Sequence, residues 1–463
     1  MQPRLLELIV IDFKLSEVAS LAFASLIGQD LIISKVSTDS RDCAGALFIA
    51  LKGEKFDGHD FIDKAVANGA VAVALSTDRP LNVPKVICKD TLRFLGLCGL
   101  CVRRKSKAFV VSLTGSCGKT TVKEYTNSIL SLKGKSIATN GNFNNDVGVP
   151  LTLLRLQEDT DFAVIEQGAS HPLDIARTSE FVESKVALIN NVGIAHLDGF
   201  ITQEGIYRGK SEILDNVYAR KGIGIVCADS PWYKNWCFDY AQEKTEGRLL
   251  SFGFSQDADV RLINLKAALD KLDFDLLIYG QNIHIELPVI GEHNALNAAA
   301  AASLAVSAGA SLEEIRQGLN QSKNLSGRLS LKDYGNFILI DDAYNASFNA
   351  VIAALKTLSL CKGHRVFIFG DMGELGKQAS DFHSQVGECA AKYVDEMLCV
   401  GPLSSFSVKA CGYKAKHFNC HADLVKYALG LMNSTYCSFL VKGSHAMHMQ
   451  TISEEIIAHG DKK

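Results

Sequence analysis

The chain has no apolar run long enough to cross a membrane and no recognisable secretory signal. Glu7 and Asp12 interrupt the apolar N-terminus, where a signal peptide would need an unbroken hydrophobic segment. The most apolar internal stretch, residues 296–310, is short, rich in alanine and contains Asn297. These absences predict a protein with no membrane partner.

A disulfide framework is also missing. Thirteen cysteines are scattered along the chain without the spacing of a disulfide-bonded or zinc-binding module. Cys98 and Cys101 form a C-x-x-C pair, but no second pair lies nearby, and the apolar residues 95–102 favour packing in a buried helix. Reduced thiols of this kind predict a cytoplasmic location.

An excess of one charge is lacking as well. The 48 lysines and arginines nearly balance the 51 acidic residues, and the net charge is −3. A chain without a basic excess gives no electrostatic reason to expect nucleic acid as a partner.

A hydrophobic fraction of 47% and a charged fraction of 21% are typical of a globular protein. The length of 463 residues suggests about three domains.

Residues 108–121 have the pattern of a phosphate-binding loop. An apolar run at 109–113 predicts a buried strand, a glycine-rich turn follows, and residues 122–132 predict a helix. In such a loop, backbone N–H groups and the helix N-terminus face the phosphates, the lysine reaches the outer phosphates, and a threonine hydroxyl can bind Mg²⁺. Leu113 replaces the first glycine of the usual pattern, so an ordinary glycine-rich turn is the alternative. The expected phosphate-binding residues are Gly115, Ser116, Cys117, Gly118, Lys119, Thr120 and Thr121.

The thiol of Cys117 lies within this turn. Its position next to a helix N-terminus predicts an accessible thiol with a lowered pKa. Phosphate binding does not require this side chain, so we expect no chemical role for it.

Two polar residues follow predicted strands of the same region. The strand at 162–165 ends at Glu166, and the strand at 186–190 leads into a loop that reaches His196. Ligands of open parallel sheets bind beyond the carboxyl ends of the strands. A lone glutamate or histidine is more often structural, but their common position predicts a Mg²⁺ site.

The remainder of this region contains further polar segments. The loop at 139–150 includes Asn144 and Asn145, and amides that both donate and accept hydrogen bonds suit a polar, peptide-like or sugar substrate. Lys210, in a predicted helix at 202–217, is by itself typical of a solvated cation. Residues 252–288 predict an inserted hairpin region. Residues 292–297 begin a long alanine-rich helix and could cap it or contact a base.

The N-terminal region predicts a small α/β unit, with strands at 31–36 and 70–75 and a helix at 60–68. After the first strand come Asp39, Ser40 and Arg41, and such a cluster suits an anion or nucleotide as well as it suits a capped turn. A polar glycine loop at 52–59 could close over a ligand. A helical connector at 89–107 then leads into the phosphate loop.

The C-terminal region alternates strands with helices. The strands are expected at 336–340, 365–369, 396–400 and 438–441, and the helices at 349–358, 381–393, 422–431 and 452–458. This alternation predicts a doubly wound, Rossmann-like domain. The fold expected for the chain is α/β with three domains: a small N-terminal α/β domain (1–88), a central parallel-sheet ATPase domain with the phosphate loop (89–322), and the Rossmann-like domain (323–463).

A nucleotide site flanked by two further α/β domains favours an enzyme that couples ATP to the joining of two other substrates. A regulatory ATPase or a nucleotide-binding scaffold is the alternative from a different class. Such a protein would bind or hydrolyse ATP without needing a second substrate.

Together these motifs make the chain similar to the Mur ligase family, and the similarity spans nearly the whole chain. The residues that match family motifs are Asp39-Ser40-Arg41, Leu47-Phe48, Asp57-Gly58-His59, residues 114–120, residues 141–145, Glu166, Asn190-Asn191, His196, Glu292-His293-Asn294, Gly327-Arg328-Leu329, residues 341–345 and residues 370–376. The family's phosphate loop also lacks the first glycine, so Leu113 agrees with it.

The resemblance implies an ATP-dependent, Mg²⁺-requiring ligase of peptidoglycan precursor synthesis. Residues 341–345 and 370–376 favour the branch that adds D-alanyl-D-alanine to UDP-N-acetylmuramoyl-tripeptide through an acyl phosphate, and we expect a monomer. One alternative is a sibling that adds a single amino acid, such as meso-diaminopimelate or lysine. Another is folylpolyglutamate synthetase, although the unit containing Asp39, Ser40 and Arg41 is evidence against it.

The resemblance also implies roles for individual residues. Lys119 and Thr120 would hold ATP phosphates and one Mg²⁺, and Glu166 and His196 would bind Mg²⁺. Lys210 matches a lysine that carries a carbamate, which turns a cation into a metal-bridging anion. The implied catalytic residues are Lys119, His196 and Lys210; the further ATP contacts are Asn294, Arg328 and Asp342; and the substrate contacts are Asp39, Ser40, Arg41, Asn144, Asn145, Tyr344 and Asn345.

One position departs from the family pattern. The family usually continues Lys-Gly-Ser with arginine, whereas this chain has His445. A histidine is shorter than an arginine and titratable, so the contact made by that arginine is not expected in the same form.

Overall fold

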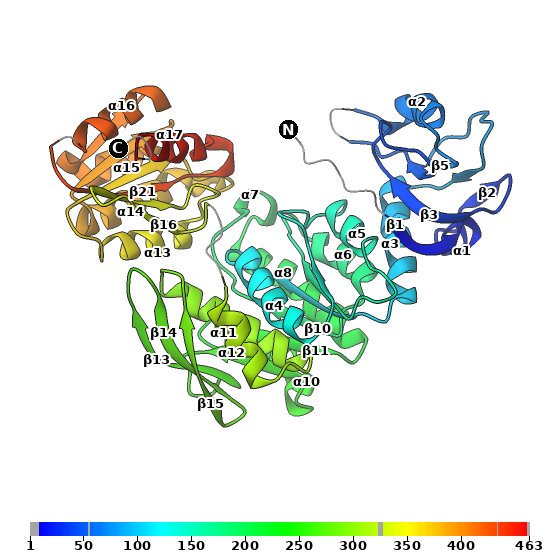
Figure 1. Cartoon of the computed structure of the whole chain (residues 1–463), viewed down its shortest axis with the longest axis horizontal. Helices are drawn as coiled ribbons and strands as arrows, with labels where there is room; N and C mark the ends of the chain where they lie inside the picture. The colour runs from blue at the N-terminus through cyan, green and yellow to red at the C-terminus, as the bar shows by residue number, and fades with distance from the viewer. Residues whose placement is uncertain (1–8, 54–55, 323–326, 433, 461–463) are drawn as a thin grey trace.

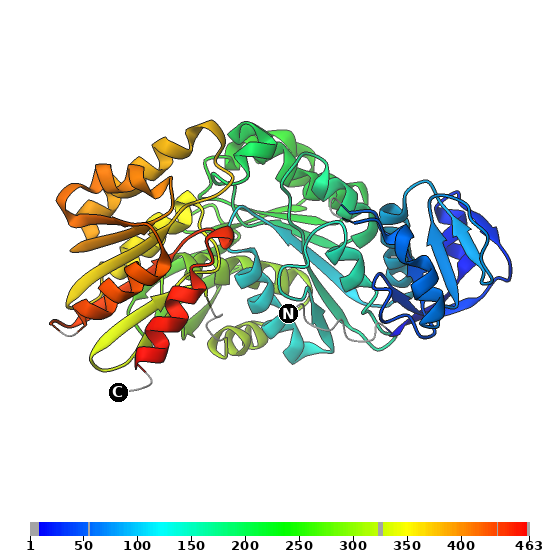
Figure 2. The same ribbon diagram turned by 90° about the horizontal axis from the view of Figure 1, so that it is seen from above.

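The computed structural model describes residues 9–53, 56–322, 327–432 and 434–460. These residues form three sheets that follow one another along the sequence, each with its own helices. The N-terminal and C-terminal units lie at opposite ends of the central one (Figures 1 and 2). The expected α/β class is confirmed. No helix of the described ranges is both long and apolar enough to cross a membrane.

The N-terminal unit is a sheet of six strands in the order β1-β3-β4-β5-β6-β2. Its inner strands run parallel, and β1 and β2 are antiparallel edges. Its elements are β1 (Ile9–Lys14), α1 (Leu15–Leu21), β2 (Ser25–Ile27), β3 (Ile32–Ser37), β4 (Leu47–Ile49), η1 (Gly58–Phe61), α2 (Ile62–Ala67), β5 (Ala72–Leu75) and β6 (Lys85–Ile87). Residues 54–55 of the expected glycine loop lie outside the described residues.

The central unit is a nine-stranded sheet in the order β15-β14-β13-β12-β11-β10-β7-β9-β8. Its first ten helices and strands among the described residues are α3 (Thr91–Lys105), β7 (Phe109–Thr114), α4 (Lys119–Lys133), β8 (Ser136–Ala138), α5 (Gly148–Leu153), β9 (Phe162–Glu166), α6 (Asp174–Val182), β10 (Val186–Ile189), α7 (Leu197–Phe200) and α8 (Gln203–Ala219). The elements that follow are β11 (Ile223–Cys227), α9 (Tyr233–Asp239), α10 (Ala241–Thr245), β12 (Leu249–Gly253), β13 (Val260–Ala267), β14 (Leu272–Ile278), β15 (Gln281–Leu287), α11 (His293–Ser307) and α12 (Leu312–Asn320). The expected hairpins are present as β13 to β15, and they extend the central sheet.

The strand before the phosphate loop lies inside this sheet, because β7 pairs with β9 on one side and β10 on the other. Val111 and Leu113 belong to a buried cluster with α4, α11 and α12. Val110, on the opposite face, belongs to a cluster that continues through α3 into the N-terminal sheet. The strand is therefore held on both faces and both edges, which gives the loop beyond it a fixed starting point.

The C-terminal unit is a sheet of six strands in the order β16-β17-β21-β18-β19-β20, in which the edge strand β16 alone is antiparallel among the described strands. Its elements are β16 (Ser330–Asp333), β17 (Phe337–Asp341), α13 (Phe348–Leu358), β18 (His364–Gly370), η2 (Gly376–Gln378), α14 (Ala379–Tyr393), β19 (Glu396–Val400), α15 (Ser404–Cys411), η3 (Gly412–Lys414), β20 (Ala415–Phe418), α16 (His421–Leu431), β21 (Cys437–Lys442), η4 (His445–Met447) and α17 (Gln450–Gly460). The expected first residue of this domain, 323, lies outside the described residues.

A substitution of Phe274, whose ring is buried on β14, can test whether the hairpins belong to the central core. It shares a cluster with Val111 and Leu113 and has no solvent exposure. We expect Phe274→Ala to lower the free energy of unfolding by about 3–5 kcal/mol, because it leaves a cavity in that cluster. Thermal unfolding measures the effect. Phe238→Ala is the matched control, since Phe238 is 83% exposed. Equal melting temperatures for the two variants would contradict the shared core.

Candidate active site

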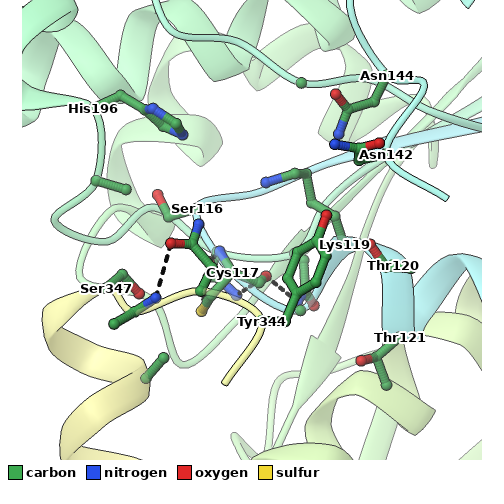
Figure 3. A pocket seen from close by; sticks show the side chains of 18 of the residues that line it. Ser116, Cys117, Lys119, Thr120, Thr121, Asn142, Asn144, His196, Tyr344 and Ser347 are labelled. Carbon is green, nitrogen blue, oxygen red and sulfur yellow. Dashed lines mark hydrogen bonds between the residues drawn. The ribbon is translucent and has the colours of Figure 1, made fainter. Parts of the chain in front are cut away.

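A cleft of about 1160 Å³ lies between the central and C-terminal units, at the carboxyl ends of the central strands. The central unit contributes the phosphate loop, the segments after β9 and β10, and the start of α11. The C-terminal unit contributes residues 327–329, 342–347, 373–375 and 444–446. Figure 3 shows Lys119, His196 and Asn144 around one opening, with Tyr344 facing them from the C-terminal unit.

The phosphate loop is held in shape by amide side chains. Asn191 brackets Cys117, because its Oδ1 accepts from the backbone N–H (2.9 Å) and its Nδ2 donates to the carbonyl (3.0 Å). Asn190 donates to the same carbonyl at 3.0 Å. Gly118 has a φ of 75°, and a Cβ there would lie 2.5 Å from the Asn297 amide oxygen. The loop therefore requires glycine at this position for both its backbone angle and its close neighbour.

Lys119 begins α4, and its ammonium group donates to the carbonyl of Gly115 at 2.9 Å. Burial lowers the pKa of Lys119, and the carboxylate of Glu166 opposes this shift. The Lys119 ammonium makes no ion pair among the described residues. The cation and its neighbouring N–H groups thus form a partly desolvated anion site at a helix N-terminus.

Glu166, the last residue of β9, is 1% exposed. One carboxylate oxygen, Oε1, accepts from the amide of Asn144 at 2.7 Å. The other, Oε2, is buried without a hydrogen-bond partner, as is the hydroxyl of Thr114. A buried carboxylate oxygen without a partner is costly, and a divalent cation coordinated by oxygens would satisfy it. This donor set fits the expected Mg²⁺ site.

His196 lies at the far side of the opening, immediately before α7, with a φ of 55°. Its Nδ1 forms an ion pair with the carboxylate of Glu374, which belongs to the C-terminal unit. The hydroxyl of Ser170 lies 3.5 Å from the same nitrogen. A residue of one domain is therefore held by a residue of the other.

Lys210, on α8, is 1% exposed and is absent from the wall of the cleft. Burial, together with the positive charge of Lys119, lowers the pKa of its amine to about 7. A lysine of this kind is partly neutral at neutral pH, which makes the amine nucleophilic. The description as a solvated cation is wrong for Lys210.

Arg328, Asp342 and Tyr344 line the cleft from the C-terminal unit, and Arg328 contacts the loop. Arg328 donates to the hydroxyl of Thr120 at 3.0 Å, and its guanidinium lies 4.2 Å from the centre of the Tyr344 ring. Asp342 pairs with Lys442 at 2.5 Å. Burial raises the pKa of Asp342, and Lys442 opposes this. These residues bring a fixed guanidinium and a buried ion pair to the seam between the two units.

Asn294 reaches the cleft at the start of α11, but its side chain already has partners. Its Nδ2 donates to the carbonyl of Ile290 at 2.8 Å, and its Oδ1 accepts from Asn297 at 3.1 Å. The neighbouring His293 also lines the cleft, and burial lowers its pKa to about 4, so its ring is neutral. Lys442 also lines the cleft, and the sequence predicted no role for it.

The implied substrate residues divide between two places. Asn144, Asn145, Tyr344 and Asn345 line the cleft, although the Oδ1 of Asn145 accepts from the N–H of Gly148 at the start of α5. Asp39, Ser40 and Arg41 do not line it. They lie on the N-terminal unit, where Arg41 pairs with Asp39 at 2.6 Å.

Two further expectations concern single residues. The lowered pKa expected for Cys117 is wrong, because desolvation inside the cleft raises the pKa of its thiol and outweighs the nearby Lys119. His445 lines the cleft, and its backbone N–H donates to Asn345 Oδ1 at 3.3 Å. Its ring meets the edge of Tyr344 at 5.9 Å between centres. Cys98 and Cys101 are buried in α3, as expected.

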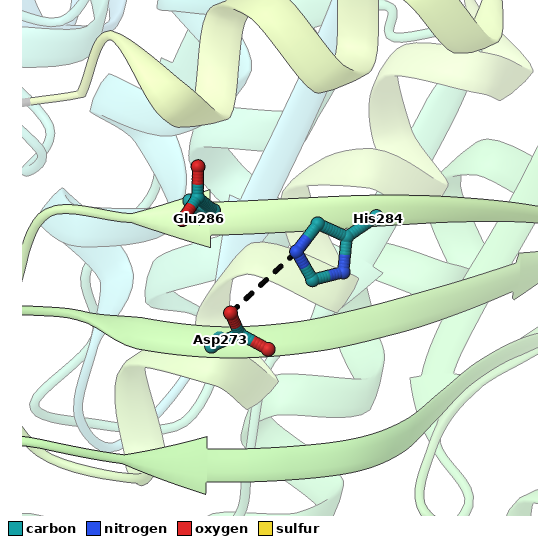
Figure 4. A group of neighbouring side chains, drawn as sticks. All are labelled: Asp273, His284 and Glu286. Carbon is teal, nitrogen blue, oxygen red and sulfur yellow. Dashed lines mark ion pairs between the residues drawn. The ribbon is translucent and has the colours of Figure 1, made fainter.

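A second group of possible metal ligands lies outside the cleft. Asp273 on β14 and His284 and Glu286 on β15 face one another on the open surface of the edge hairpin (Figure 4). His284 lies 3.5 Å from Asp273, and Glu286 is paired with Lys271. Opposite charges across neighbouring strands explain this cluster without an ion.

Models of one family match three parts of the chain. The model described as "Mur ligase family, catalytic domain" matches residues 32–92, "Mur ligase middle domain" matches 113–305, and "Mur ligase, glutamate ligase domain" matches 327–445. Together they include the phosphate loop, Glu166, His196 and the C-terminal side of the cleft.

Relatives cover the chain from end to end. The UDP-N-acetylmuramoyl-tripeptide–D-alanyl-D-alanine ligase of Escherichia coli is 38% identical over 97% of this chain and 100% of its own. The crystal structure of MurF from Acinetobacter baumannii superimposes with a TM-score of 0.90, at 33% identity over 97% of this chain and 100% of that one. MurF ligase from Thermotoga maritima, solved in complex with ADP, has a TM-score of 0.80 at 26% identity over 92% and 98%. With its three matching domains and these full-length relatives, the chain belongs to the Mur ligase family.

Proposed function

We propose that this chain is an ATP-dependent ligase that joins UDP-N-acetylmuramoyl-tripeptide to D-alanyl-D-alanine in peptidoglycan precursor synthesis. It would act as a cytoplasmic monomer with domains at 1–88, 89–322 and 323–463. The cleft supports this most strongly, because a phosphate loop faces arginine, tyrosine and carboxylate side chains of a second domain. A ligase needs such a seam, since a phosphate donor and an amine must meet away from water.

ATP would occupy the loop and the start of α11. The backbone N–H groups at 115–121 and Lys119 would hold the phosphates, Asn294 would contact the nucleotide from the central unit, and Arg328 and Asp342 would contact it from the C-terminal unit. The Thermotoga maritima relative was solved in complex with ADP, which supports the use of an adenine nucleotide. Arg328 now donates to Thr120 and would remain close to a bound triphosphate.

Mg²⁺ would be held by Thr120, Glu166 and His196, with Lys210 as a further ligand once carbamylated. The buried and unpartnered oxygen of Glu166 is the observation that favours a cation here. When bound, Mg²⁺ would neutralise the charge that gathers between the carboxylate and the triphosphate.

The reaction would proceed in two displacements. An oxygen of the tripeptide's terminal carboxylate attacks the γ-phosphorus, the bond to the β-phosphate oxygen breaks, and ADP leaves. The amine of D-alanyl-D-alanine then attacks the acyl carbon, and inorganic phosphate leaves with the electrons of the C–O bond. Lys119 would stabilise the phosphoryl oxygens, and the closed seam would keep water from the acyl phosphate.

The two groups of substrate residues fit one long substrate. Asp39, Ser40 and Arg41 would contact the uridine nucleotide on the N-terminal domain, which lies at the far end from the C-terminal domain (Figure 1). Asn144, Asn145, Tyr344 and Asn345 would contact the peptide in the cleft. A nucleotide-linked peptide extends from one place to the other.

Mass analysis of the product tests the function directly. With UDP-N-acetylmuramoyl-tripeptide, ATP and Mg²⁺, we expect D-alanyl-D-alanine to yield the pentapeptide product and single amino acids to yield none. Phosphate release is expected to depend on both acceptor substrates, because the carboxylate and the amine each take part in a displacement. Phosphate release that is indifferent to the dipeptide would instead favour a regulatory ATPase.

Lys119→Ala should lower turnover by about 10²–10³-fold, because it removes a preorganised cation from the phosphoryl oxygens. Lys135→Ala is the matched control, since Lys135 is half exposed and pairs with Asp159 on the surface. Phosphate release with all substrates present measures both variants. Near-normal turnover of Lys119→Ala would count against the assigned site.

The amine of Lys210 should form a carbamate in a pH-dependent manner. Addition to CO₂ needs the neutral amine, so the carbamate fraction rises as the pH rises through about 7 and falls at lower pH. Carbon NMR with ¹³C-bicarbonate should show a signal that is stronger at about pH 8 than at about pH 6. The signal should be missing from Lys210→Arg, and its persistence there would exclude Lys210 as the modified residue.

A further inference from the structure

We propose that Glu374 is the positioning residue of His196, so that the C-terminal domain completes the cation site of the central domain. The inference rests on the proposed function, because it assumes that His196 is a ligand of the cation. It predicts that docking of the two domains and binding of the cation support each other.

Glu374 holds the loop of His196 at two points. Its carboxylate pairs with Nδ1 of His196, and its backbone carbonyl accepts from the N–H of Leu197 at 2.9 Å. Beneath them, Leu197 and Leu375 belong to one hydrophobic cluster that joins the two domains. One residue of the C-terminal domain thus binds both a side chain and the backbone of the central domain.

The segment that presents Glu374 is itself firmly held. The buried carboxylate of Asp371 accepts from the N–H groups of Leu403 (3.1 Å) and Ser404 (2.6 Å). The N–H of Met372 donates to the ring of His383 at 3.0 Å. Glu374 therefore moves with the C-terminal domain. It can contact His196 only when that domain is docked on the central domain.

The backbone is unusual on both sides of this contact. His196 has a φ of 55° and Glu374 a φ of 59°, and both are in the left-handed region that residues other than glycine seldom adopt. Such conformations persist where the surroundings determine them, and they gather at functional sites and switch regions. Two of them face each other across the domain seam.

The chemistry of a metal-bound histidine explains what this contact would do. Such a histidine commonly donates its other ring N–H to a carboxylate, which fixes the tautomer and makes the ligand nitrogen more basic. With its proton on Nδ1 facing Glu374, His196 keeps the lone pair of Nε2. This nitrogen has no hydrogen-bond partner among the described residues and is the ligand atom left for the cation.

Titration with Mn²⁺, followed by electron paramagnetic resonance on the full chain, tests the inference without turnover. Glu374→Ala should raise the Kd for Mn²⁺ about 10–100-fold, the usual effect of removing such a carboxylate. Glu374→Gln should recover part of the affinity, because its amide oxygen still accepts from Nδ1. Glu204→Gln is the matched control, since Glu204 forms an exposed ion pair with Arg208 on the neighbouring α8.

Glu166→Gln separates this inference from the proposed function. If Glu166→Gln weakens Mn²⁺ binding but Glu374→Ala does not, the positioning role is wrong and the cation site stands. If neither variant weakens it, the proposed site itself is wrong. If Glu374→Ala and Glu374→Gln lose the same affinity for Mn²⁺, Glu374 acts only through its charge. This result would also refute the positioning role.

A second measurement follows the domains themselves. With dyes on the central and C-terminal domains, energy transfer should show that Mg²⁺ draws the domains together in the unsubstituted chain and less so in Glu374→Ala. Coupling between two equilibria is reciprocal, so a variant that weakens the effect of domain closure on cation binding must also weaken the effect of the cation on closure. Closure that responds equally to Mg²⁺ in both proteins would contradict the coupling.

Discussion

Charged side chains of α4, α8 and β9 are withdrawn from water without enough opposite charge beside them. Burial lowers the pKa of Lys119 and of Lys210, and Glu166 has a carboxylate oxygen with no partner. Such an arrangement is costly, because removing a charge from water is repaid only by a well-placed counter-charge. In the proposed function, a triphosphate with its cations would supply the missing partners and offset this cost.

The remaining structure serves to keep these charges in place. A strand buried on both faces ends at the loop, and the amides of Asn190 and Asn191 hold the backbone of Cys117. Gly118 permits the tight approach of Asn297. None of these groups needs to react. Their effect is to hold N–H groups and cations ready for phosphate, so that little reorganisation is needed when it arrives.

The C-terminal domain is part of the site and not only its cover. Arg328 bonds Thr120 of the loop, and Glu374 pairs with His196. An acyl phosphate is easily lost to water, and a site assembled from two domains can exclude water at the moment that it becomes complete. The phosphate loop and the segment that carries Glu374 therefore meet at one seam, where the proposed function needs both.

Much of the fold follows from local pattern. The strand expected at 396–400 is β19 itself, and most other strands and helices lie within two residues of their expected ends. Short elements at the periphery were missed, among them β16, β20 and α15. Both β16 and β20 are partly exposed and largely polar. They therefore lack the run of apolar residues from which a strand is predicted. The pKa of Cys117 was misjudged because the sequence reveals a helix start but not the desolvation around it.

Periodicity and turn chemistry over a few neighbouring residues are enough to predict the polar residues at the strand ends, the order of the domains and the glycine-rich phosphate loop. They are not enough to predict which of these residues meet. Arg328 bonds a residue 208 positions away, Glu374 contacts His196, and the charge of Lys119 acts on the buried Lys210. Such contacts arise from the packing of whole domains, and no local pattern in the chain records how one domain surface fits another.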